Sequence, residues 1–510
     1  MSGSIVGKIL LCVIVVILCF VIGAQAAESI MSSLIVITAI VGVVFMLVMG
    51  PRSWMLLFLL PPLIRLLPGP QRAINAAYVV APAILVYWII MWGMGYVKIR
   101  WRSMWLLDLL AFLSFALMVA AYIKRPVSVL ILGLDTDNIG GAVFVWVIGA
   151  FFYYMALSCI PMQANQLGRI LNWSIWIKLV SVTIFAARGM MNPDSAVGVE
   201  MGMGEAMQET RYIYMMELGS YLVVLLYSLF PLVRFLTNPL LLLGMASGYV
   251  MVLLSGFRSA FADNVLCVVF MSMVKREFIL LLSLALISYG GLFVLNSSGG
   301  TESLPFGVQR VMSAIPGMSM DETASRDADA SADWRYEMWG WAMDARTGFI
   351  EDYVWGDGFG ISQSELRRDQ LAMMRGEMHY GNQDQFARTK QWHSLIISTI
   401  QSVGYVGLAV VITMVYCVGL LSFKVCSSLR NTPLFFPSLV LLFPFSSNMF
   451  MLFLRARTMT GYFDWFITVA QLKLLYCVAR EQGLLIPWMQ RKRYIPKMIQ
   501  EYEEKLRPAQ

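Results

Sequence analysis

Apolar segments long enough to cross a bilayer recur along almost the whole chain. A helix needs about 17 to 25 mostly apolar residues to cross roughly 30 Å of hydrocarbon, and about fourteen such windows fit in this sequence. They lie near residues 5–27, 30–50, 53–67, 74–96, 103–122, 141–160, 169–187, 216–235, 239–255, 259–274, 277–296, 393–421, 433–453 and 458–478. The sequence therefore predicts an all-α polytopic membrane protein with about 14 transmembrane helices.

Composition excludes several other classes of protein. Apolar residues make up 59% of the chain and charged residues only 14%, whereas a soluble globular protein carries roughly 25% charged residues. The mean hydropathy of +0.70 is spread over the whole length, which excludes a soluble enzyme with one anchor and also excludes disorder. The apolar runs are continuous, so an outer-membrane barrel with alternating strands is excluded as well.

The window 53–67 is the weakest of these segments. It contains Pro61, Pro62 and Arg65, and prolines remove backbone donors inside a helix. We therefore expect a re-entrant or broken helix there, because irregular backbone is tolerated at membrane depth only where it is buried in protein or lines a cavity.

The positions of lysine and arginine set the orientation. Short connections rich in these residues stay on the cytoplasmic side, and the basic clusters share one side if both termini are cytoplasmic. The long segment 297–392 then faces outward, with 15 acidic and 9 basic residues. We expect a bundle of about 11 helices over 1–296, an outer loop domain over 297–392, about three helices over 393–478, and a basic cytoplasmic tail over 479–510.

Several kinds of chemistry receive no support. Topology explains the basic excess, so no nucleic-acid partner is expected. The seven cysteines lie in or beside apolar runs and suggest no disulfide framework. Two histidines are too few for a zinc or haem site, and we expect neither metal nor cofactor. Acidic pairs such as Asp135 with Asp137 or Asp327 with Asp329 keep a metal-dependent oligosaccharyl transferase as an alternative.

The outer segment is rich in arginine. It has eight arginines against the single Lys390, and it contains or borders both histidines, His379 and His393. The planar guanidinium binds phosphate oxygens in pairs and stays charged, so an anionic substrate at the outer surface is expected. The alternative is that these arginines pair with the carboxylates of the same segment.

Residues 333–346 have helical spacing and carry two neighbouring stripes. The first stripe is apolar and fits packing onto the membrane domain, whereas the second pairs arginine with tryptophan, which suits recognition of a phosphate and a sugar. The first comprises Trp334, Met338, Trp341 and Ala345, and the second Arg335, Trp339, Ala342 and Arg346.

Three further motifs surround this helix in the sequence. Gly356, Gly358 and Gly360 form a turn that admits positive φ or close backbone approach. His393 opens an apolar span and is followed by Gly404 and Gly407; it fits a general base near neutral pH or a residue that caps the helix. Arg258 lies at the outward end of two spans, where it snorkels to the interface or faces a cavity and holds phosphate.

In this order the motifs resemble those of the O-antigen ligase/polymerase superfamily, bacterial inner-membrane glycosyltransferases that use polyprenyl-diphosphate-linked glycans. The resemblance covers roughly residues 250–410, and it departs from the family where Ser394 replaces asparagine and Ser402 replaces an acidic residue. It implies that Arg258 and Arg335 hold the diphosphate of an undecaprenyl-diphosphate glycan. It also implies that His393 contacts or deprotonates the acceptor hydroxyl, without a metal.

Other outer-side residues are candidates for substrate binding, with interfacial anchoring as the alternative for the arginines. They are Arg188, Arg211, Trp339, Arg346, Arg455 and Arg457.

Among the family's activities, length and span count favour a polymerase of O-antigen or exopolysaccharide repeat units; a ligase acting on lipid A-core is the alternative. The resemblance implies a multi-pass inner-membrane protein with a periplasmic active site. Expected partners are the lipid-linked donor, a glycan or lipid A-core acceptor, the bilayer and a chain-length regulator. A transporter of lipid-linked glycans is the rival from another class, since ionisable residues within the spans could line a polar path. These residues are Asp108, Lys178, Glu217, Asp263, Asp464 and Lys473.

Overall fold

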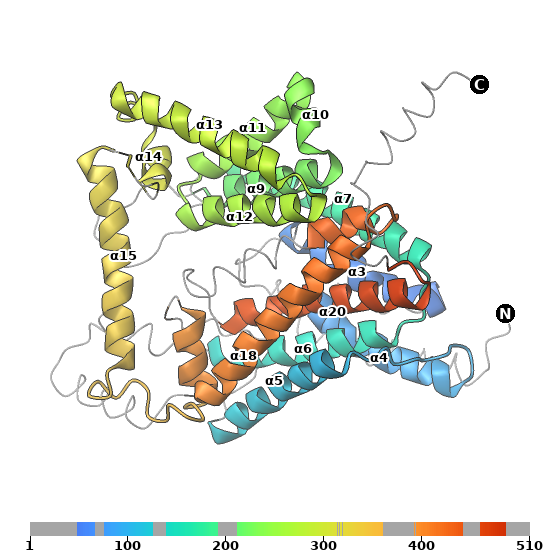
Figure 1. Cartoon of the computed structure of the whole chain (residues 1–510). Helices are drawn as coiled ribbons and strands as arrows, with labels where there is room; N and C mark the ends of the chain where they lie inside the picture. The colour runs from blue at the N-terminus through green and yellow to red at the C-terminus, as the bar shows by residue number, and fades with distance from the viewer. Residues whose placement is uncertain are drawn as a thin grey trace, which may run out of the picture.

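The computed structural model describes residues 48–66, 76–125, 139–191, 212–313, 315, 317–318, 320–360, 392, 394–441 and 459–485. All regular elements in these ranges are helices, which confirms the all-α prediction for this part of the chain (Figure 1). Their bounds are η1 Gly50–Met55, α3 Leu56–Leu59, η2 Pro61–Leu66, α4 Ala76–Gly93, α5 Trp105–Lys124, α6 Ile139–Cys159, α7 Ala164–Met191, α9 Ile213–Leu229, α10 Leu232–Thr237, α11 Pro239–Leu254, α12 Arg258–Lys275, α13 Phe278–Ser297, α14 Phe306–Met312, α15 Glu322–Met343, α18 Leu395–Ser428 and α20 Met459–Glu481.

The helices form two packed groups. One group contains α9 to α13 and buries an apolar core that includes Val223, Tyr227 and Met271. The other contains α3 to α7 with α18 and α20, and its larger core includes Tyr153 and Leu475. Helix α7 packs against α9 and joins the two groups (Figure 1).

Four described helices are long and apolar enough to cross a membrane: α5, α7, α13 and α18. Shorter apolar helices cover parts of the windows at 74–96, 141–160, 216–235 and 239–255. The window 5–27 lies outside the described residues. Most of the windows 30–50 and 433–453 also lies outside the described residues, and α12 and α20 occupy 259–274 and 459–478. The structure thus has long apolar helices at four of the predicted windows and shorter ones at four more, while the number of fourteen spans stays a prediction.

Residues 50–66 are broken into η1, α3 and η2 instead of forming one helix. The single α-helical turn ends at Leu59, just before Pro61 and Pro62. Because proline cannot donate to the helical ladder, the break falls where the sequence predicts it. The prediction of a broken helix in 53–67 is confirmed.

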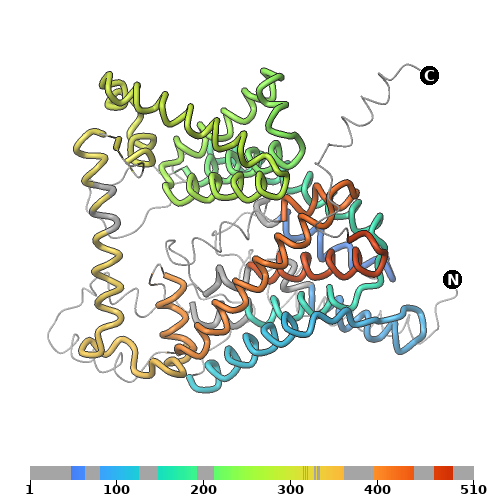
Figure 2. Tube along the Cα trace, viewed as in Figure 1, coloured from blue at the N-terminus to red at the C-terminus, as the bar shows by residue number. Residues whose placement is uncertain are grey.

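Helix α18 also contains a break. Gly404 has φ 70° and ψ −173°, a conformation that is essentially restricted to glycine. The element therefore consists of two helical halves that meet at this residue, and the tube of α18 in Figure 2 changes direction near its N-terminal end. The first half begins at Leu395, two residues after position 393.

The outer segment is partly helical, as expected, and its main element is α15. A helix of 22 residues is about 33 Å long, and α15 runs from α14 to the first half of α18 (Figure 1). Its buried residues include Met338 and Ala342, whereas Trp341 is 42% exposed. The predicted division into two stripes is wrong here: α15 ends at Met343, and Ala342 packs on the same face as Met338, four residues earlier.

Candidate functional site

A loop of the outer segment bridges the break in α18. Since Gly404 interrupts the helical ladder, backbone groups on both sides need partners from elsewhere. Residues 353–358 provide them through four backbone hydrogen bonds: Asp357 N–H to Gln401 O at 2.6 Å, Gly358 N–H to Ser402 O at 3.1 Å, Tyr405 N–H to Tyr353 O at 2.8 Å and Val406 N–H to Val354 O at 3.3 Å. The loop therefore replaces the ladder that the break removes.

Glycines allow this close approach. A Cβ on Gly404 would lie 2.1 Å from the carbonyl oxygen of Val354, and one on Gly356 would lie 2.3 Å from the backbone nitrogen of Val403. Both glycines have positive φ, as does Gly358. The prediction that the glycine turn serves positive φ and close backbone approach is confirmed.

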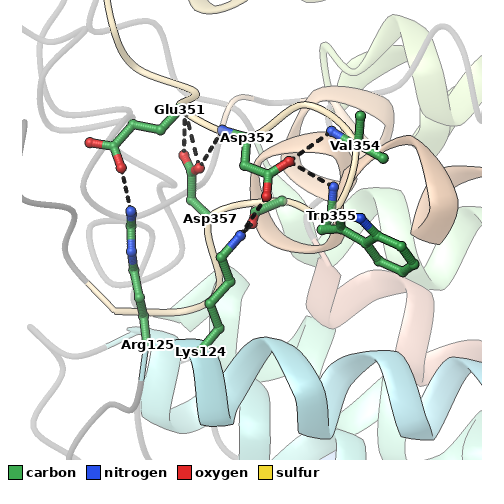
Figure 3. Close-up of polar contacts among 8 residues, drawn as sticks. Lys124, Arg125, Glu351, Asp352, Val354, Trp355 and Asp357 are labelled. Atoms are coloured by element: carbon green, nitrogen blue, oxygen red, sulfur yellow. Dashed lines mark hydrogen bonds and ion pairs between the residues drawn. The ribbon is translucent and has the colours of Figure 1, made fainter.

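Two carboxylates shape the loop from inside (Figure 3). Asp357 is 1% exposed and accepts hydrogen bonds from the backbone N–H groups of Glu351 and Asp352 at 2.9 to 3.1 Å. Asp352 accepts from the N–H groups of Val354 and Trp355 at 3.0 and 2.9 Å. These bonds hold residues 351–357 in a tight turn.

The C-terminal end of α5 fastens this turn from outside (Figure 3). The Lys124 ammonium donates to the Asp352 carboxylate at 2.7 Å and to the Gly356 carbonyl oxygen at 2.5 Å. Arg125 forms an ion pair with Glu351. The ammonium of Lys124 holds the pKa of the Asp352 carboxyl below its usual value. We call residues 351–358 together with Lys124 and Arg125 the Gly404 clasp.

Aromatic and amide side chains fix the residues that flank position 393. Trp392 is fully buried, and its indole N–H donates to Gln401 Oε1 at 2.8 Å. Trp339 of α15 donates its indole N–H to the Trp392 carbonyl oxygen at 2.7 Å. On the other flank, Ser394 is the N-cap of α18, and its hydroxyl oxygen accepts from the Ile397 N–H at 3.5 Å.

Serine is a preferred N-cap residue, because its side-chain oxygen accepts from the first free N–H groups of a helix. Ser394 therefore suits the position at which α18 begins.

The described site candidates lie on four different elements. Arg335 and Trp339 are half-buried on α15, one helical turn apart. Arg258 is half-buried at the first residue of α12, and Arg188 is exposed in the last turn of α7. Arg346 lies beyond α15 with its side chain 94% exposed, 3.6 Å from Asp344.

The remaining candidates, His393, Arg211, Arg455 and Arg457, lie outside the described residues.

The two arginines implied by the resemblance to hold the diphosphate lie on different helices, Arg258 on α12 and Arg335 on α15 of the outer segment. Arg258 follows Gly256, whose turn abuts Gly307 near the start of α14. Helix α15 begins beside α14, since the Asp321 N–H donates to Gln309 at 3.1 Å. Arg335 comes thirteen residues after Glu322, a rise of about 20 Å along the helix. Among the described candidates, Arg335 and Trp339 are the ones on the helix that reaches position 393.

The sequence reasoning assigned no role to Lys124, Arg125, Asp352 or Gln401. One signal could have singled out the first two. They follow the window 103–122 at its outward end in the predicted topology, where basic residues are less common than on the cytoplasmic side. Cations in that place suggest carboxylate partners in the outer segment.

The described residues contain no group of three histidine, cysteine, aspartate or glutamate side chains placed to hold a metal ion. No protein-family model, curated protein or solved structure matches this chain.

Proposed function

We propose that the protein is a bacterial inner-membrane glycosyltransferase that polymerises glycan repeat units from undecaprenyl-diphosphate-linked donors at the periplasmic face. One observation carries the proposal. The motifs that resemble the O-antigen ligase/polymerase superfamily run from Arg258 to Gly407. Arg258 lies apart at the start of α12, but the glycine turn, Trp339 and the residues flanking His393 meet around the break at Gly404. Convergence of separate motifs is expected of a site and not of unrelated packing segments.

The chemistry needs few groups. The acceptor hydroxyl oxygen forms a bond to the anomeric carbon of the donor sugar while the bond from that carbon to the diphosphate oxygen breaks. His393 receives the hydroxyl proton on an imidazole nitrogen, and the diphosphate leaves with the electron pair. Arg335, half-buried one turn before Trp339, stabilises the negative charge that develops on the leaving group.

Against the transporter alternative stands the pairing of two ionisable residues that would have lined its path. Lys473 and Asp108 contact each other at 2.5 Å and are almost fully buried. Paired charges of this kind hold helices together, which leaves neither residue available to a permeating solute in this arrangement. The ligase shares the donor chemistry of the polymerase, and the experiment separates the two.

The test uses a strain that lacks the gene, complemented with wild type, His393→Ala, Arg335→Ala or Arg335→Lys at matched membrane levels. Surface glycan and lipid-linked glycan are resolved on gels. A polymerase deletion leaves single repeat units, whereas a ligase deletion leaves long chains on the lipid carrier. We expect both alanine variants to resemble the deletion and Arg335→Lys to be poor, because a point charge does not replace a planar fork. Normal glycan from both alanine variants refutes the site.

A further inference from the structure

We infer that Lys124 is a positioning residue: by holding the Gly404 clasp it fixes the first half of α18, and thereby the chain on both sides of His393. The mechanical part of the inference stands on contacts alone. Its consequence for glycosyl transfer rests on the proposed function.

The break at Gly404 makes the first half of α18 depend on other residues for its orientation. A continuous helix would hold residues 395–403 through its own ladder of hydrogen bonds. At Gly404 that ladder is interrupted, and the carbonyl groups of Gln401 and Ser402 are bonded to the clasp instead. The orientation of the first half relative to the second therefore depends on residues 353–358.

Lys124 holds those residues from the end of α5. Lys124 contacts two points of the turn, the Asp352 carboxylate at 2.7 Å and the Gly356 carbonyl oxygen at 2.5 Å. The residue after Gly356 is Asp357, whose N–H makes the 2.6 Å bond to Gln401. Lys124 therefore binds the carbonyl oxygen of the same peptide group whose N–H makes the shortest bond across the break.

Polar contacts continue from Gln401 to the residue before position 393. Gln401 Oε1 accepts a hydrogen bond from the indole N–H of Trp392 at 2.8 Å, and Gln401 Nε2 donates to the Phe349 carbonyl oxygen at 3.4 Å. Trp392 is the residue before His393. A contiguous series of polar contacts thus runs from Lys124 through Asp357 and Gln401 to the start of α18, the kind of network through which a displacement is transmitted.

The charge balance favours this positioning role over a phosphate site. The clasp contains two cations, Lys124 and Arg125, and three carboxylates, those of Glu351, Asp352 and Asp357. An anion approaching Lys124 would meet a net negative surrounding, and the ammonium is already bonded to a carboxylate. The Lys124 ammonium therefore binds a carboxylate of the protein and not an anionic ligand.

The experiment compares Lys124→Met, which keeps the length of the side chain and removes the donor, with Lys124→Arg, which keeps the charge. Asp352→Asn breaks the same contact from the other side while leaving an oxygen for the Val354 and Trp355 N–H groups. Arg326→Met is the matched control, because it removes an exposed ion pair with Glu322 in the same outer segment. Each full-length chain is purified in nanodiscs for hydrogen exchange and expressed in the deletion strain for glycan analysis.

We expect amides 401–406 to exchange about tenfold faster in Lys124→Met and Asp352→Asn, with no change in Lys124→Arg or Arg326→Met. The yield of long-chain glycan should fall about tenfold in the first two variants, because small misplacements of a reacting group reduce rates strongly. The Lys124→Met/Asp352→Asn double variant should fall no further than Lys124→Met alone, since Lys124→Met already removes the contact with Asp352.

Unchanged exchange in Lys124→Met overturns the inference. Faster exchange with full glycan yield overturns its catalytic part and leaves the proposed function intact, provided that His393→Ala still abolishes product. If His393→Ala has no effect, the proposed function fails, and the exchange data alone then decide whether Lys124 holds α18.

Discussion

Helix α5 carries an ion pair at each end, and the two pairs differ in environment. Near its start, Asp108 contacts Lys473 of α20 at 2.5 Å, with the lysine side chain 1% exposed and the aspartate side chain 10% exposed. At its end, Lys124 contacts Asp352 at 2.7 Å, with both side chains more than a third exposed. The two nitrogen–oxygen distances are similar, but water reaches the pair at the end of α5 and hardly reaches the pair near its start.

The buried pair belongs to a network in which each charged oxygen has partners. Asp108 also accepts from the Tyr154 hydroxyl at 2.6 Å and from the Ser103 hydroxyl at 3.1 Å. Lys473 also donates to the Ser158 hydroxyl at 2.7 Å. Helices α5, α6 and α20 are thereby tied together at one point. Such satisfaction is required, because an unpaired buried charge is very costly.

The contrast separates two uses of charge on one helix. In a dry environment, loss of one partner destabilises the fold, since the other charge cannot be hydrated. In a half-exposed environment, water replaces the lost partner and the free energy of unfolding changes little. The outer pair can therefore hold a loop in place while contributing little to global stability.

The largest effect should come from Lys473→Met. We expect it to lower the free energy of unfolding by about 3–5 kcal/mol, because it leaves the Asp108 carboxylate buried without its cation. Thermal or denaturant unfolding in detergent measures the change, with Lys98→Met, at an exposed lysine that precedes α5, as the control. Adding Asp108→Asn to Lys473→Met should recover part of the loss. If Lys473→Met is as stable as wild type, the buried ion pair near the start of α5 contributes no more to stability than the exposed pair at its end.

Gly404→Ala should be the next largest change and should act on the clasp. The residue occupies a conformation that costs about 1–3 kcal/mol for other residues, and its Cβ would lie 2.1 Å from the Val354 carbonyl oxygen. We expect faster exchange over residues 353–358 and little long-chain glycan. Gly290→Ala in α13 is the control, because nothing lies within 4 Å of a Cβ there. Slow exchange at the clasp in Gly404→Ala would show that the loop does not depend on this close contact.

The sequence predicted the features that depend on local chemistry. Apolar windows located α5, α7 and α13, prolines located the break in 53–67, and the glycine turn at 356–360 was expected to need positive φ. Each rests on a property of the residues themselves, namely length, a missing donor or a missing Cβ. Such properties hold whatever the rest of the chain does.

Features that depend on distant partners were not predictable in this way. Lys124 and Asp352 are 228 residues apart, and no spacing rule relates them. The stripes of 333–346 were misassigned because the sequence does not show where α15 ends or which neighbour covers it. Trp339 was assigned to substrate, and its indole N–H is engaged by the Trp392 carbonyl. Its ring packs against the core cluster that contains Met338 and Trp392, so its role toward a substrate stays a prediction.

The smallest effect is a dependence of the clasp on pH and salt. The pKa of Asp352 is lowered in the folded chain, mainly by its hydrogen bond to Lys124. A carboxyl whose pKa is lowered by folding contributes its full stabilisation at pH values above its pKa in the unfolded chain, about 3.9 for aspartate. That stabilisation is lost as the pH falls through the pKa of the folded chain. The melting temperature of wild type should therefore exceed that of Asp352→Asn slightly at pH 7, and the difference should shrink as the pH falls below about 3.9. Because exposed ion pairs contribute about 0.2–1 kcal/mol and are screened within about 3 Å at 1 M salt, high salt should shrink the same difference. It should leave the effect of Lys473→Met in place. A difference that is unchanged on acidification and in about 1 M salt would show that it does not come from the ion pair with Lys124.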